Sequence, residues 1–308
     1  MANSFAATTK MAEALDKALT QASVTGFFAD NDLSAKFIGA KTVSIPDLAL
    51  SGLADYSRSS GFVGGDVTVA RTTYTLTQDR GRSFQIDAQD NDESGVANLS
   101  GQIMGEFVRT QVVPEMDAYI LSKLAGVAST NSHTVSVGTS STVDADCYKM
   151  FQSAELSVRE ALGFGDEELV CFCNPTYWAA LQKSTAFTRQ IVISDFAKGG
   201  INLKVQSING IALLPVAAAR MKTAYTFNNG TSEGQTAGGF TPTTAAKGIG
   251  FILMPKKGAS LVKKTEVPRM FTPKQNLNAD AYKIDYRVFY DIFTKKSMKN
   301  AIYAYIEA

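Results

Sequence analysis

Apolar residues recur at helical spacing from Val96 to Ala125, which predicts one long helix of about 45 Å at the usual rise per residue. Ser94 suits the N-cap, and Gly126 predicts the end of the helix. Pro114 predicts a kink, because a proline inside a helix removes the hydrogen bond to the carbonyl four residues earlier. The apolar stripe consists of Ile103, Phe107, Val112, Met116, Tyr119, Ile120 and Leu124. Taken alone, this pattern also suits the core helix of an ordinary domain.

β-forming residues before this helix predict a hairpin, with strands Val67–Thr77 and Arg82–Ala88 and a turn at residues 78–81. Neither face of the first strand is apolar enough to form a core. Because a lone two-stranded hairpin is marginally stable in water, the ribbon needs a neighbouring surface. A second subunit can supply that surface.

The sequence before the hairpin predicts a short amphipathic helix, Ala7–Ala22, followed by an irregular tract from Thr25 to Gly65. Pro46 interrupts a strand-like piece within the tract, and proline is confined to edge strands and bulges. An irregular tract of roughly 40 residues is unusual in a compact domain, so we expect an extended arm that lies along another surface.

Helices and strands alternate irregularly after the long helix, without a regular βαβ rhythm, which favours an α+β fold. Asn209-Gly210 between two apolar runs is a strong hairpin signal. A Gly- and Thr-rich segment predicts a surface loop at residues 226–247. The expected helices are 143–162 and 176–182, and the expected strands are 133–137, 168–173, 202–208, 211–216, 248–254, 282–293 and 301–306.

Composition indicates a globular protein that can bury a sizeable core, with 308 residues of which 45% are hydrophobic. Thirty basic residues against 29 acidic ones give a net charge of +1, so no strong field attracts nucleic acid or acidic membranes. Residues 1–30 carry charges among their apolar positions, so we expect neither a signal peptide nor a membrane anchor, and a cytoplasmic site of synthesis.

Candidate chemistry is sparse, and we predict no catalytic, cofactor-binding or metal-binding residue. His133 is the single histidine, which makes a hydrolytic triad or a zinc site improbable, and the three cysteines are expected to be buried free thiols. No phosphate-binding loop or dinucleotide fingerprint is present. The acidic run before the long helix lacks the ligand spacing of a calcium loop and is explained by the helix dipole; it comprises Asp87, Asp90, Asp92 and Glu93. An unrecognised pair of carboxylates stays open as an enzyme alternative.

Four segments carry a family resemblance: Glu106–Tyr119 (EFVRTQVVPEMDAY), Leu169–Leu181 (LVCFCNPTYWAAL), Ser207–Pro215 (SINGIALLP) and Gly250–Lys257 (GFILMPKK). Their order, after an arm and a hairpin and before a strand-rich return, is similar to that of tailed-bacteriophage major capsid proteins of the HK97-like fold. The resemblance covers roughly residues 40 to 308. It implies an N-terminal arm (1–60), an extended loop (61–92), a peripheral domain with a long spine helix (93–134 and 255–308) and an axial domain (135–254).

The resemblance implies a non-enzymatic major capsid protein that self-assembles as pentamers and hexamers into an icosahedral shell around double-stranded DNA. The expected location is the virion, after assembly in the host cytoplasm. Expected partners are further copies of the chain, a separate scaffolding protein, a portal and packaged DNA bound without sequence specificity, with decoration proteins as further candidates and no membrane. An encapsulin-type nanocompartment shell is the alternative within the same fold.

The extended loop is expected to contact a neighbouring subunit, as members of this family do. The candidate contact residues are Tyr74, Leu76, Arg80, Arg82 and Phe84, with Pro114 as the kink of the spine helix. Some relatives crosslink a lysine of this loop to an asparagine of a neighbour. Residues 61–90 contain no lysine here, so we do not expect that chemistry.

Overall fold

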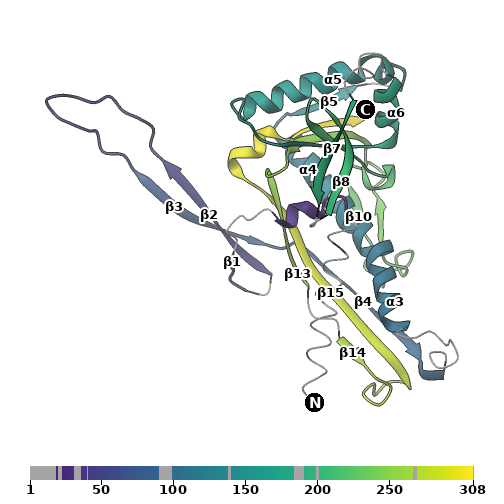
Figure 1. Ribbon diagram of the computed structural model, residues 1–308. Coiled ribbons are helices and arrows are strands. Elements are labelled where there is room, and N and C mark those ends of the chain that lie inside the picture. The colour runs from purple at the N-terminus through teal and green to yellow at the C-terminus, as the bar shows by residue number, and fades with distance from the viewer. Residues whose placement is uncertain are drawn as a thin grey trace.

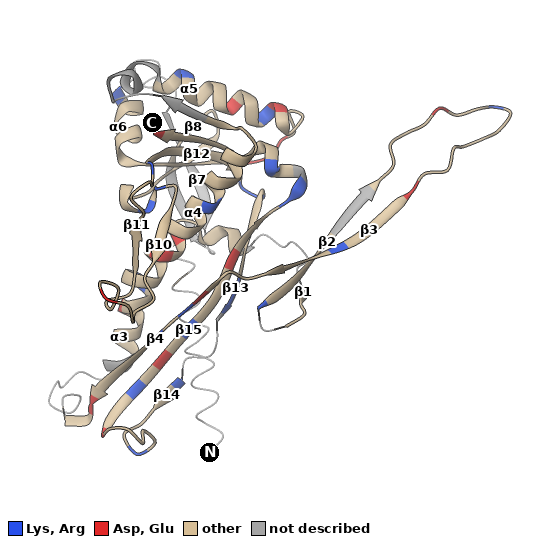
Figure 2. Ribbon diagram, turned by 180° about the vertical axis from the view of Figure 1, so that it is seen from behind, with Lys and Arg blue, Asp and Glu red and all other residues tan. Residues whose placement is uncertain are grey.

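The structure is a computed structural model that describes residues 19, 23–30, 36–39, 41–89, 99–137, 140–183, 191–198, 201–265 and 269–307. A body of two large sheets, a two-stranded sheet and several helices carries a hairpin that projects far from it (Figures 1 and 2). The predicted helix Ala7–Ala22 and the predicted N-cap Ser94 lie outside the described residues, apart from Leu19.

A seven-stranded sheet forms one end of the body, with strand order β5-β16-β12-β6-β9-β8-β7. Helices α5 (Ser140–Ala161) and α6 (Pro175–Lys183) cover one face, and helix α4 (Val113–Thr130) covers the other. Strands with two covered faces are apolar throughout, as in β6 and β12. The strands are β5 (Thr134–Val137), β6 (Leu169–Cys173), β7 (Ile191–Lys198), β8 (Ile201–Ile208), β9 (Ile211–Pro215), β12 (Ile249–Pro255) and β16 (Tyr303–Glu307).

A second sheet extends from the body and is built around the 14-residue strand β15 (Ala281–Thr294). β15 pairs along one edge with β13 (Ala259–Thr265) and β14 (Arg269–Phe271), and along the other with β4 (Gln78–Asp87). One face of this sheet packs on the long helix and shares its core. The helix therefore joins the two sheets.

The predicted long helix runs without interruption from Leu99 to Thr130, as α3 (Leu99–Phe107), a π-helical turn η2 (Val108–Val112) and α4. The N–H of Val113 donates to the carbonyl of Val108, five residues earlier. Pro114 follows directly, and its ring would clash with the carbonyl of Thr110, which explains the wider turn at this point. A bend of the axis at Pro114 stays a prediction.

Gly126 does not end the helix, which continues to Thr130, so that prediction is wrong. Glycine inside a helix costs about 1 kcal/mol relative to alanine. Ala128 is fully buried in the core of the long helix, and its burial outweighs that cost.

The predicted hairpin is also wrong: strands β3 (Val67–Thr75) and β4 do not pair with each other. β3 pairs with β2 (Thr42–Leu50), with Leu50 opposite Val67, so the true hairpin includes part of the expected arm. The expected turn at residues 78–81 lies inside β4. A Cβ on Gly81 would lie 2.7 Å from the carbonyl oxygen of Tyr286, so Gly81 permits a close approach of two strands instead of a turn.

The other predicted elements are present with boundaries shifted by a few residues, and Asn209 and Gly210 both have positive φ in the tight turn between β8 and β9. The expected loop 226–247 contains a short antiparallel pair, β10 (Tyr225–Phe227) and β11 (Phe240–Pro242). The remaining short elements are β1 (Lys36–Phe37), which pairs with β2, and the 3₁₀ turns η1 (Gly26–Asp30), η3 (Ala218–Arg220) and η4 (Lys296–Ala301). The predicted α+β class is confirmed, while the division into arm, loop, peripheral and axial domains stays a prediction.

We expect Gly250→Ala to lower the free energy of unfolding by about 3 kcal/mol, because overpacking a core is costly. Gly250 lies at a register shift between β12 and β16, where a Cβ would come within 2.0 Å of the Tyr305 ring. Gly105→Ala is the matched control, since no atom lies within 4 Å of its Cβ position in α3, and it should stabilise the protein by about 0.5 to 1 kcal/mol. Urea titration of both variants measures this difference. Equal stability of the two would contradict the packing of Tyr305 against residue 250.

Candidate assembly surfaces

The hairpin tip, residues 50–69, is the first candidate surface, because it exposes apolar side chains far from the body (Figure 1). Leu53 is fully exposed and Phe62 is 90% exposed. The rings of Tyr56 and Phe62 contact each other, with their centroids 4.9 Å apart. Other exposed apolar residues of the tip are Leu50, Val63, Val67 and Val69. An apolar patch of this kind marks an interaction surface.

The root of the hairpin packs on the second sheet through a small separate core. It contains the buried side chains of Val43, Leu76, Val262, Phe289 and Phe293, with Ile45 and Tyr74 packed against them. The Nε and Nη2 atoms of Arg287 each donate a hydrogen bond of 2.9 Å to one carboxylate oxygen of Asp79. Lys41 pairs with the same carboxylate. The root is therefore fixed, while the tip is free of contacts with the described body.

We expect Asp79→Asn to lower stability by about 1 kcal/mol at pH 7, after allowance for the partial exposure of these side chains. The hydrogen bonds from Arg287, and then those from Lys41, lower the pKa of Asp79 to about 2 from 3.8 although partial burial acts against them. Because the folded protein holds the ionised form, this stabilisation is present above pH about 4 and is lost as the pH falls toward 2. Urea titrations from pH 7 to pH 2.5 should show the two proteins converging, and a constant difference across that range would contradict the ion pair.

A buried carboxylate fixes the chain where β3 gives way to β4. Asp291 is 1% exposed and accepts hydrogen bonds from the backbone and hydroxyl of Thr77 (3.3 and 3.0 Å) and from the hydroxyl of Tyr119 (2.8 Å). Lys123, one turn further along α4, pairs with the same carboxylate. Burial raises the pKa of Tyr119 well above its ordinary value. This network ties the hairpin root to the long helix.

A second buried carboxylate holds the first described segment against α4. Asp117 is completely buried and accepts hydrogen bonds from Ser23 (2.6 Å), from the hydroxyl and N–H of Thr25 (2.7 and 3.1 Å) and from the N–H of Val24 (3.1 Å). Arg220 donates a longer bond of 3.3 Å to the same group. Residues 23–25 therefore wrap a carboxylate of the helix.

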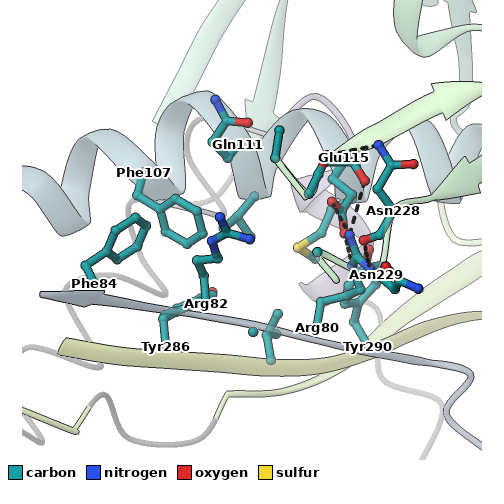
Figure 3. A pocket seen from close by; sticks show the side chains of 18 residues that line it. Arg80, Arg82, Phe84, Phe107, Gln111, Glu115, Asn228, Asn229, Tyr286 and Tyr290 are labelled. Atoms are coloured by element: carbon teal, nitrogen blue, oxygen red, sulfur yellow. Dashed lines mark hydrogen bonds and ion pairs between the residues drawn. The ribbon is translucent and has the colours of Figure 1, made fainter. Parts of the chain in front are cut away.

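A pocket of about 240 Å³ lies between the long helix, the paired strands β4 and β15, and the loop between β10 and β11. We call it the helix–sheet pocket (Figure 3). Phe84, Phe107 and Tyr286 form its aromatic wall, with ring centroids 4.9 and 5.9 Å apart in edge-to-face contacts. Its polar side is formed by Arg80, Arg82, Gln111, Glu115, Asn228 and Asn229.

The two arginines of the pocket differ in their partners. Arg80 donates to Glu115 at 2.6 and 3.1 Å and to the carbonyls of Asn228 and Gly239. Arg82 is exposed, and its Nη1 and Nη2 atoms donate long hydrogen bonds of 3.4 Å to the carbonyl oxygen of Thr236. Arg80 is thus neutralised within the chain, whereas no carboxylate among the described residues pairs with Arg82.

The predicted contact residues fall into two groups. Tyr74 and Leu76 lie at the hairpin root, and Leu76 is buried there. Arg80, Arg82 and Phe84 lie on β4 and line the helix–sheet pocket, and none of them lies beside a hairpin turn. Their role in contacts between subunits stays a prediction. The sequence analysis did not predict the exposed apolar surface of the tip. Leu53 and Phe62, two large apolar residues in a Gly- and Ser-rich segment, could have indicated it.

The described part of the chain contains no cluster of metal-binding side chains. No group of three or more His, Cys, Asp or Glu side chains there is placed to hold a metal ion. Cys147, Cys171 and Cys173 are buried free thiols, as predicted. Among the described helices, none is long and apolar enough to cross a membrane.

Comparison with known proteins identifies the fold. No protein-family model and no curated protein matches the chain. Among solved structures, the mature capsid of bacteriophage PhiM1 is similar with a TM-score of 0.55 and 13% identity, over 87% of this chain and 82% of that one. The capsid of cyanophage P-SCSP1u has a TM-score of 0.55 and 13% identity, over 89% and 85% of the two chains. A structure from Gordonia phage Cozz has a TM-score of 0.55 and 14% identity, over 86% and 81%. The predicted phage capsid fold is therefore confirmed.

Proposed function

We propose that this chain is the shell-forming subunit of a tailed phage or prophage, and that copies of it assemble as pentamers and hexamers into an icosahedral container for double-stranded DNA. The observation that carries the proposal is the projecting hairpin. It exposes fully solvated apolar side chains at its tip, and it stands on a fold shared with phage capsids. An exposed apolar patch of this kind is typical of a surface that binds another protein.

The proposed role is structural. The buried carboxylates Asp117 and Asp291 are saturated with donors from the chain's own backbone and side chains, which suits an architectural role better than acid–base chemistry. The proposed contact of the shell's inner face with packaged DNA involves no sequence readout, and the net charge of +1 gives it no strong overall electrostatic attraction. A separate scaffolding protein and a portal are further proposed partners.

Sedimentation and electron microscopy of the purified chain test the proposal. We expect closed shells or ring-shaped capsomers, and nuclease-protected double-stranded DNA in particles taken from infected or induced cells. Shells that enclose a co-purifying protein and no nucleic acid would favour the nanocompartment alternative. A monomer that persists at millimolar concentration would contradict both forms of the proposal.

A further inference from the structure

The helix–sheet pocket places a cation beside an aromatic wall. The rings of Phe84, Phe107 and Tyr286 form the wall, and Figure 3 shows the side chain of Arg82 next to it. Glu115 neutralises the neighbouring Arg80, whereas no carboxylate in the described part of the chain pairs with Arg82. The pocket therefore offers a positive charge and an apolar surface side by side.

We propose that the helix–sheet pocket binds a small aromatic carboxylate, with the ring of the ligand against the aromatic wall and its carboxylate on Arg82. Small-molecule sites combine an apolar lining with a few placed polar groups that fix the orientation of the ligand. A guanidinium suits a carboxylate, because its planar set of N–H donors matches the two carboxylate oxygens. The inference goes beyond the proposed shell function and does not depend on it, since every group that it uses belongs to one chain.

The loop between β10 and β11 supports the assignment of Arg82, because it leaves space for the guanidinium. Gly230 and Gly238 have φ values of 76° and 74°, and a Cβ on these residues would lie 3.1 and 3.4 Å from Nη1 of Arg82. Side chains at the two positions would crowd the guanidinium, and glycine adopts positive φ at no steric cost. The bonds to the Thr236 carbonyl are long and use two of the five N–H donors of an arginine. The guanidinium is thus held in place and still has donors for a stronger acceptor.

The size of the pocket and the geometry of its wall support an aromatic ligand. Its volume of about 240 Å³ is larger than that of an engineered apolar cavity of about 150 Å³ that binds benzene. The pocket therefore has room for one ring and a short acid chain. Phe84 and Tyr286 both meet Phe107 edge to face, and a ligand ring would extend this packing in an arrangement that aromatic pairs prefer.

Titration of the full-length chain with 3-phenylpropionate tests the inference, by calorimetry and by ligand-observed NMR. We expect a Kd of about 1 mM, which is typical of a ligand with roughly ten heavy atoms. The neutral analogue 3-phenylpropanol should bind about tenfold more weakly, because it lacks the charge that pairs with Arg82. Acetate, which lacks the ring, should show no saturable binding.

Two variants and a matched control locate the ligand. We expect Arg82→Gln to weaken the binding of 3-phenylpropionate about tenfold and to leave the binding of 3-phenylpropanol unchanged. Arg109→Gln is the control, because Arg109 lies on the same long helix outside the pocket and pairs with Glu106, so it should change neither affinity. Gln111 is exposed and lines the pocket from the helix, so Gln111→Trp should fill the pocket and abolish the binding of both compounds.

Three results would overturn the inference. The first is no binding of 3-phenylpropionate at about ten times the expected Kd. The second is an affinity that neither Arg82→Gln nor Gln111→Trp changes, because the compound would then bind elsewhere on the chain. The third is binding to unassembled subunits with none to assembled particles, which would assign the pocket to a neighbouring protein surface. The proposed shell function stands under all three results.

Discussion

Replacing residues 51–66 with Asn-Gly is expected to leave a folded, soluble subunit that no longer forms stable particles. Leu50 and Val67 are opposite each other in the hairpin, so a two-residue Asn-Gly turn joins them with the geometry that short hairpins prefer. None of the removed residues belongs to the hydrophobic cores of the described structure, so the free energy of unfolding should change by under about 1 kcal/mol. Urea titration measures the fold, and sedimentation measures the assembly.

A variant with a 16-residue Gly/Ser segment in place of the tip separates loop length from side-chain contacts. It should fail to assemble in the same way, because the apolar and acidic side chains are missing. Particles of normal yield from either variant would contradict the role of the tip.

The second large effect is expected from Asp117→Ala, which should destabilise the protein by about 3 kcal/mol or more. The substitution removes a buried acceptor of five hydrogen bonds and leaves the donors of residues 23–25 and Arg220 without it. A buried donor without a partner costs about 1 to 3 kcal/mol, and a charged one costs more. The loss should appear in urea titration, together with earlier proteolytic cleavage of the first 30 residues.

Asp117→Asn is the matched control, because the amide keeps one acceptor oxygen and nearly the same shape while losing the charge. We expect it to lose roughly half as much stability as the alanine variant. Equal stability of the alanine variant and the original chain would show that residues 23–25 do not depend on Asp117.

Local signals predicted the elements whose pairing is decided nearby. Asn209-Gly210 favours a two-residue turn through its own backbone preferences. The apolar stripe of the long helix predicted the face of the helix that packs in the core. The predicted pairing of β4 was wrong because its true partner, β15, lies about 200 residues later in the chain. Gly81 looks like a turn residue in sequence, and only the carbonyl of Tyr286 beside it shows that it serves a close strand contact.

The candidate surfaces were harder to predict for the same reason. The helix–sheet pocket combines residues from β4, the long helix, β15 and the loop after β10, so no window of sequence contains it. The alternation of Arg80, Arg82 and Phe84 along one face of a strand was visible, but the surface that they face is set by tertiary packing. The family resemblance supplied the fold, and the pairing of β2 with β3 required the structure.

The connection between β3 and β4 makes the projecting hairpin a mechanical tether. Only Leu76 and Thr77 separate the two strands, which follow nearly one line in Figure 1. A pull on the tip is therefore transmitted along β4, which pairs with β15 over ten residues from Gln78 to Asp87. Because ladder hydrogen bonds lie perpendicular to the strands, such a pull loads them in shear, and all of them share the force. The hairpin can thus bear tension from a neighbour without peeling away from its own subunit.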